Sequence, residues 1–256
     1  MAITTYHNPH NRTQTHSTTA MSFVPTALAV ALGLLMLDAA LEMALISSMV
    51  YWLHYRAGKD FTVTYAGTAF SLHGKPLGLL GDQGHTSNGA AGTAFVLIGL
   101  GGILALWARS RDKHGRRFYH FWLAMTAVSV LLTLAALIWT FYLTNDHAGQ
   151  TIDVALASTL DNHPYPDYKA YGLDLWTPEN WFVAVLQLQL VKAGERRDIE
   201  SHLKVMKGWR WNLIPLFVLG CVVCALAVAD ALASRRELRS RRAMEGEERE
   251  GKRMST

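Results

Sequence analysis

Four long apolar segments constrain this chain more than any other feature of its sequence. They cover about residues 24–53, 90–108, 118–143 and 213–233, and none of them contains Lys or Arg. A helix needs about 20 predominantly apolar residues to cross the hydrocarbon core of a bilayer. The sequence therefore predicts an all-α integral membrane protein, with four transmembrane helices in one membrane domain over residues 22–233.

Basic residues between and after these segments predict how the chain is oriented. The connection 109–117 holds five strong bases in nine residues, and a second group of arginines follows residue 233. Lys and Arg are enriched on the cytosolic side of a membrane. We therefore expect both termini in the cytosol, most simply at the plasma membrane, with outer loops over 54–89 and 144–211. The glycosylation sequon at Asn11 argues for the opposite orientation, but the basic residues outweigh it.

The two ends of the chain are polar. Residues 1–21 lack a periodic apolar pattern and are expected to be a disordered cytosolic N-terminus. Residues 234–256 form a charged cytosolic tail, either a helical extension or a solvated end that touches anionic lipid. The formal net charge is +4, with the positive charge gathered beside the apolar segments. This distribution indicates the lipid bilayer as the partner and argues against nucleic acid.

The two outer loops are predicted to form a small α+β cap. Residues 60–74 alternate apolar and polar side chains on each side of Ala66 and Gly67, a pattern typical of a β-hairpin. Residues 75–89 are expected to be irregular. Thr177 and Pro178 together predict a helix start. Residues 195–211 repeat apolar side chains at helical spacing, which predicts an amphipathic helix that meets the fourth span.

Asp38 and Glu42 are the most specific feature within the apolar segments. They are four residues apart and therefore share one face of the first helix. A carboxyl group at the centre of a span costs roughly 2.5–3.5 kcal/mol on insertion scales. We expect this intramembrane polar pair to face the bundle interior or a partner. Two roles are open: structural assembly, and the handling of protons or cations. Asp230 is expected to be interfacial.

No catalytic, cofactor-binding or metal-binding residue is predicted, and no cofactor is expected. Six histidines fall in the outer loops without a metal-ligand spacing: His54, His73, His85, His147, His163 and His202. Cys221 and Cys224 lie within the fourth span and are interpreted as small packing residues. Motifs of nucleophilic or phosphate-binding enzymes are absent from the sequence.

The motifs WTPENWF (176–182) and GWRWNLIPLF (208–217) resemble a family of four-span membrane proteins from filamentous fungi. The general layout is also similar to the fungal Sur7/PalI group and the claudin-like proteins. Those groups carry a cysteine pair in the first outer loop, which this sequence lacks. The resemblance implies four spans with cytosolic ends, and no activity.

We therefore expect a non-catalytic scaffold that organises membrane components, with other membrane proteins or a second copy of itself as partners. One alternative is an ion- or proton-handling transporter or channel subunit that uses Asp38 and Glu42. A second alternative is a lipid-modifying membrane enzyme, which requires acids or histidines of the outer loops to converge in one cavity.

Overall fold

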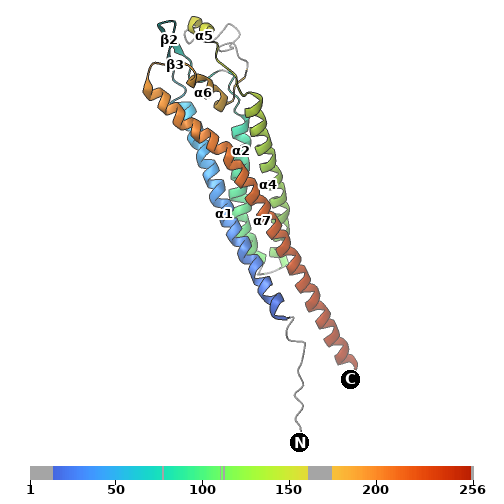
Figure 1. Cartoon of the computed structure of the whole chain (residues 1–256). Helices are drawn as coiled ribbons and strands as arrows, with labels where there is room; N and C mark the ends of the chain where they lie inside the picture. The colour runs from blue at the N-terminus through green and yellow to red at the C-terminus, as the bar shows by residue number, and fades with distance from the viewer. Residues whose placement is uncertain (1–13, 77, 110, 112, 161–174, 255–256) are drawn as a thin grey trace.

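The computed structural model of the chain is an elongated helical bundle with a cap at one end, and α1 begins and α7 ends toward the other (Figure 1). It describes residues 14–76, 78–109, 111, 113–160 and 175–254. In chain order its elements are α1 (Gln14–Tyr55), β1 (Phe61–Tyr65), β2 (Thr68–Leu72), α2 (Asp82–Gly92), the π-helical segment η2 (Thr93–Leu100), α3 (Gly101–Arg109), α4 (Lys113–Asp146), α5 (Val154–Leu160), α6 (Pro178–Leu186), β3 (Gln189–Leu190) and α7 (Ala193–Met254).

Four helical segments are long and apolar enough to cross a membrane, which fits an integral membrane protein. They are Phe23–Tyr55 in α1, Asp82–Arg109 through α2, η2 and α3, His114–Asp146 in α4, and Ala193–Glu247 in α7. A helix of 33 residues, such as the first of these, is about 50 Å long at about 1.5 Å per residue. The hydrocarbon core is about 30 Å thick, so the helices extend beyond it.

Two boundaries differ from those expected from the sequence, and the structure chooses between the two alternatives for the charged tail. The second spanning segment begins at Asp82 and not near residue 90, so the expected irregular loop ends in a helix. Residues 14–21 belong to α1, which corrects the expectation of disorder there, whereas residues 1–13 lie outside the described part of the chain. The charged tail continues α7 to Met254. Arg, Lys and Glu are good helix formers, and this accounts for the helical extension.

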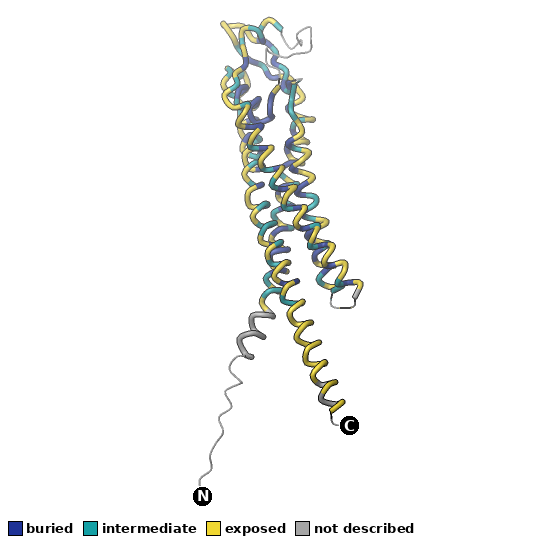
Figure 2. The backbone as a smooth tube through the Cα atoms, turned by 90° about the vertical axis from the view of Figure 1, so that its right-hand side faces the viewer, coloured by how far each residue is buried: buried dark blue, intermediate teal, exposed yellow. Residues whose placement is uncertain are grey.

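The bundle core lies where the four spans meet. Helix α1 packs on α7 and on the α2–η2 segment, and α4 packs on α7, α3 and α2. Buried positions follow the inward faces of the helices, while the outward faces are exposed along their length (Figure 2). Those exposed faces are largely apolar, as expected of surfaces that contact lipid.

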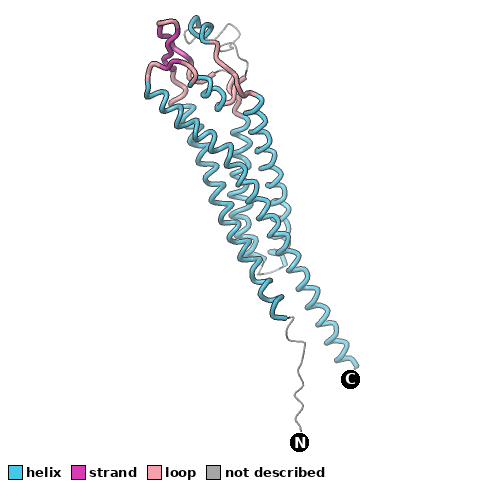
Figure 3. The backbone as a smooth tube through the Cα atoms, in the orientation of Figure 1, coloured by secondary structure: helices cyan, strands magenta, loops and turns pink. Residues whose placement is uncertain are grey.

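The cap contains a small sheet with the strand order β2-β1-β3 (Figure 3). Strands β1 and β2 form the hairpin that the sequence predicts, with Tyr65 opposite Thr68. Its turn residues Ala66 and Gly67 have φ angles of 47° and 81°. Two consecutive positive φ values are characteristic of a type I′ turn, which suits the twist of a two-residue hairpin.

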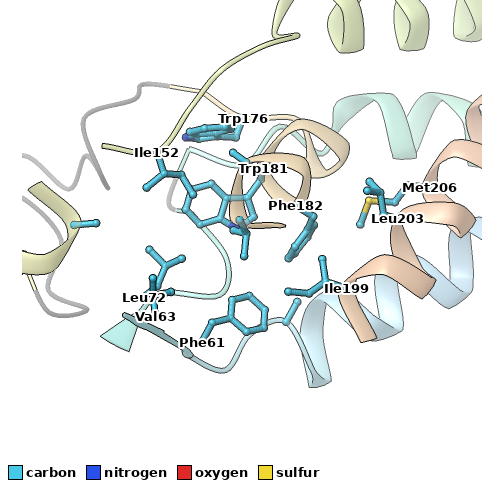
Figure 4. Close-up of a cluster of buried hydrophobic side chains, with 14 of the residues drawn as sticks. Phe61, Val63, Leu72, Ile152, Trp176, Trp181, Phe182, Ile199, Leu203 and Met206 are labelled. Atoms are coloured by element: carbon cyan, nitrogen blue, oxygen red, sulfur yellow. The ribbon is translucent and has the colours of Figure 1, made fainter. Parts of the chain in front are cut away.

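The cap has a hydrophobic core of its own, centred on Trp176, Trp181 and Phe182 (Figure 4). The predicted helix start is confirmed, because the side chain of Thr177 accepts a hydrogen bond of 3.2 Å from the backbone N–H of Asn180. The predicted amphipathic helix is confirmed as the first part of α7. Its apolar side chains pack into the cap core, so one continuous helix joins the cap to the bundle.

Candidate functional site

The intramembrane acids lie at the contact between α1 and α7. Glu42 is fully buried, and its Oε2 accepts a hydrogen bond of 3.0 Å from the side-chain amide of Asn212. The same amide lies 3.5 Å from the backbone carbonyl oxygen of Asp38. Asp38 itself is half-buried at the margin of the contact. Asn212 thus ties α7 to both positions of α1.

Two carboxyl oxygens of this cluster have no hydrogen-bond partner among the described residues. They are Oδ2 of Asp38 and Oε1 of Glu42, and both are buried. The indole of Trp209 faces the Glu42 carboxyl, but its Nε1 does not reach hydrogen-bond geometry. Buried polar atoms without partners cost free energy, so this cluster retains capacity to accept further hydrogen bonds.

A second polar cluster lies near the opposite end of the bundle, around Asp230 of α7. Asp230 is 3% exposed, accepts a hydrogen bond of 2.7 Å from the hydroxyl of Tyr119, and forms an ion pair with Arg109. The guanidinium carbon of Arg109 lies 4.7 Å from the centre of the Tyr119 ring. The cluster therefore joins α3, α4 and α7 inside the bundle, and the interfacial depth expected of Asp230 stays a prediction.

Hydroxyl groups also follow the buried face of α4. Thr126, Thr133 and Thr144 each donate a hydrogen bond to the backbone carbonyl four residues earlier. Thr140 lies 3.3 Å from the hydroxyl of Ser87 on α2. The three threonine hydroxyls form their hydrogen bonds within α4 itself, so they allow neighbouring helices to pack closely without a polar contact to either acidic cluster.

The π-helical segment η2 adapts the second span to its neighbours. A π-helix shifts backbone hydrogen bonding from the usual α pattern, and here the indole N–H of Trp122 donates to the carbonyl of Ile98 at 3.1 Å. A Cβ atom at Gly102 would lie 2.7 Å from the Trp122 ring, and one at Gly99 would lie 2.3 Å from the side chain of Met36. A Cβ atom at either position would therefore force a neighbouring side chain to shift.

The histidines of the predicted outer loops separate into two groups. His54, His73 and His85 line one cavity of about 1020 Å³ between the bundle and the cap. His202 stacks on Trp52 with ring centres 4.4 Å apart, and His147 follows α4, while His163 lies outside the described residues. Within the described part of the chain, no group of three or more His, Cys, Asp or Glu side chains is placed to hold a metal ion.

Cys221 and Cys224 are free thiols on α7, partly covered by the bundle.

Comparison with protein-family models, with curated proteins and with solved structures finds no match. The fold and the sites therefore define the chain only as a capped bundle with four helices able to span a membrane.

Proposed function

We propose that this protein is a non-catalytic membrane component that organises or stabilises other membrane components. The observation that carries the proposal is that both buried acids engage side chains of neighbouring helices. Glu42 is bonded to Asn212 across the α1–α7 contact, and Asp230 is bonded to Tyr119 and Arg109 across three helices. Polar groups used in this way fix helix positions in a bilayer.

The cap supports the same proposal. Its aromatic core is joined to the bundle through the first part of α7, so the cap and the spans share one helix. A rigid frame with an ordered cap suits a role in holding partners in place, whereas a catalytic role requires reacting groups gathered at one site. Three histidines line the cavity, but no carboxylate is among its described lining residues.

Native mass spectrometry of the protein, extracted gently from its own membrane, tests the proposal. We expect a stable complex, either with another membrane protein or with further copies of this chain. The variant Asn212→Leu tests whether the contact between α1 and α7 is needed for the complex, because it removes the hydrogen-bond donor to Glu42 while leaving the cap core intact. We expect this variant to reduce the yield of the complex. A lone monomer in the wild-type extract would contradict the proposal.

A second candidate function is ion or proton handling at Asp38 and Glu42. It is favoured by the two buried carboxyl oxygens that have no partner among the described residues. Reconstitution into liposomes separates the two functions. Flux that is abolished by combining Asp38→Asn with Glu42→Gln, with complex formation unchanged, would support transport. The organiser proposal predicts no specific flux and a weakened complex in the same variant.

The cytosolic position of both termini and the plasma membrane are part of this proposal. The orientation rests on the arginines that follow residue 233 and on the bases of the 109–117 connection, which do not distinguish one membrane from another. Membership of the fungal four-span family stays a prediction from the two motifs. Protease treatment of sealed vesicles from the native membrane tests the orientation: we expect the tail after residue 233 to be cleaved only when the cytosolic face is accessible.

A further inference from the structure

The cavity between the cap and the bundle lies where a membrane interface is expected. Its walls are the cap end of α1, described residues of the loop between β2 and α2, the start of α2, Pro178 of α6 and one turn of α7. The exposed rings of Tyr51 and Tyr55, with centres 4.6 Å apart, stand at its edge. Tyr and Trp rings concentrate at the level of lipid headgroups, which places the cavity at that level.

Gln83 shows that the cavity contains an unused hydrogen-bond acceptor. Gln83 lines the cavity at the start of α2 and is 2% exposed. Its Oε1 has no hydrogen-bond partner in the part of the chain that the structure describes. A buried acceptor without a donor costs free energy, and a ligand with a hydroxyl group would supply that donor.

His54, on the α1 wall of the cavity, adds a second acceptor. Its Nδ1 lies 2.8 Å from the backbone carbonyl oxygen of Val50. Because a carbonyl only accepts, Nδ1 carries the proton, and the neutral ring then presents Nε2 as an acceptor. Two acceptors on one cavity favour a ligand with more than one hydroxyl group.

Lys75 gives the cavity a positive charge. It is the only Lys or Arg among the described lining residues, and no Asp or Glu lines the cavity with it. An uncompensated ammonium group favours a phosphate, which it binds as a point charge. The remaining wall is largely apolar, with Ile46, Val50 and Leu53 of α1 on one side.

From these groups we propose that the cavity binds a membrane lipid whose headgroup carries a phosphate and free hydroxyl groups. The phosphate contacts Lys75, the hydroxyls donate to Gln83 and His54, and the acyl chains lie along the apolar wall of α1. The volume of about 1020 Å³ reaches the upper end of the range of about 300–1,000 Å³ typical of ligand sites. This inference is independent of the organiser function.

Competition between defined lipids, measured by native mass spectrometry on the full-length protein, tests the assignment. Phosphatidylglycerol offers both phosphate and hydroxyls, phosphatidic acid lacks the hydroxyls, and phosphatidylcholine lacks net charge and hydroxyls. We expect retention in that order. Free glycerol phosphate carries the same headgroup without chains, and its binding in preference to the lipid would overturn the assignment to a lipid.

Two variants assign the contacts. Lys75→Met is expected to reduce the preference for phosphatidylglycerol over phosphatidylcholine by about tenfold, the effect of one charge-assisted hydrogen bond. Lys59→Met is the matched control, because Lys59 is exposed at the same end of the molecule and does not line the cavity. Gln83→Leu keeps the side-chain volume and is expected to reduce the preference for phosphatidylglycerol over phosphatidic acid by about fivefold.

The outcomes of these experiments distinguish specific binding of a lipid headgroup from nonspecific occupation of the cavity by any lipid. Equal retention of all three lipids by the wild type would overturn the proposal, as would unchanged preferences in Lys75→Met and Gln83→Leu. Thermal unfolding of each variant, compared with wild type, establishes that the fold is intact. If Gln83→Leu fails to fold, the Lys75→Met and Lys59→Met pair alone decides the result.

Discussion

The cap and the membrane bundle each have a core, but the two cores are made of different side chains. In the cap, Trp176, Trp181 and Phe182 are fully buried. In the bundle, Leu35 and Leu37 are the same kind of side chain on opposite sides of α1, with Leu35 1% exposed and Leu37 71% exposed. Apolar character separates inside from outside where a surface meets water, but it cannot do so where a surface meets lipid.

The difference explains where polar and small residues lie. In the bundle, the face that each helix turns inward is the one that carries polar side chains with hydrogen-bond partners on other helices, such as Glu42 and Asp230. The same faces carry glycines that leave room for a side chain of the neighbouring helix. In the cap, the inward faces are those that carry large aromatic rings, because burying these rings removes a large apolar area from water. The two regions should therefore respond to different substitutions.

The largest effect is expected in the cap core. Trp181 is fully buried, packs edge-on against Trp176 at 5.0 Å, and donates its indole N–H to the carbonyl of Gly74 at 2.9 Å. Trp181→Ala should cost about 3–5 kcal/mol and make the cap sensitive to protease while the bundle stays helical. Trp211→Ala, at a position 55% exposed, is the control. Equal losses in the two variants would contradict a cap held by its aromatic core.

In the bundle, the next effect is expected at Asp230. Asp230→Asn leaves the half-buried Arg109 without its acid and should cost about 3 kcal/mol, measured as thermal stability in detergent. The double variant Arg109→Met with Asp230→Leu removes both charges, and the hydroxyl of Tyr119 can then donate its proton to the carbonyl of Ala227 at 3.1 Å. Most of the loss should then be recovered. If the double variant is less stable than the single one, the ion pair is not the source of the effect.

A smaller effect is expected where η2 and α3 approach their neighbours. Gly102→Ala would bring a Cβ to 2.7 Å from Trp122 and 3.0 Å from Leu32, so overpacking should cost about 1–3 kcal/mol. Gly33→Ala is the matched control, because a Cβ there meets nothing within 4 Å. It should be neutral or slightly stabilising, since alanine is the better helix former. The midpoint of thermal unfolding compares the two, and equal shifts would show that close packing is not responsible.

The smallest effect is expected from a titration in the cap. Glu179 lies 3.3 Å from Arg210, and burial raises the pKa of its carboxyl more than Arg210 and Lys207 lower it. The folded protein therefore binds this proton more readily than the unfolded chain, and the contribution to stability is lost as the pH rises through the folded pKa. Compared with Glu179→Gln, the wild type should gain stability between pH 7 and pH 4.5. A gain with rising pH would contradict the burial of Glu179.

Much of the architecture was predictable from local sequence. Runs of apolar residues gave the four spans, alternation around Ala66 and Gly67 gave the hairpin, and Thr177 with Pro178 gave a helix start. The start of α2 at Asp82 was missed because the polar residues 82–89 carry no apolar period, although they cover the cap end of the bundle.

The sites were less predictable because they join residues that are distant in sequence. Asp230 meets Arg109 and Tyr119 because α3 ends at Arg109 and α4 begins at Lys113, and both helix ends lie beside the same part of α7. The sequence did contain one signal for this ion pair: Arg109 ends the second span, and Asp230 lies near the end of the fourth span that is expected on the same side. The cavity combines α1, α2, α7 and a loop, and no linear motif marks such a combination.

The most direct test of the account is a double-mutant cycle on Glu42 and Asn212. Glu42 ties α1 to α7 through the hydrogen bond of 3.0 Å that its carboxyl group accepts from Asn212. Thermal stability in detergent of Glu42→Leu, Asn212→Leu and the double variant should give a coupling of about 0.5–3 kcal/mol, with each single variant destabilised. Additive effects with no coupling would show that Glu42 is not a structural tie, and would favour its use for ions or protons.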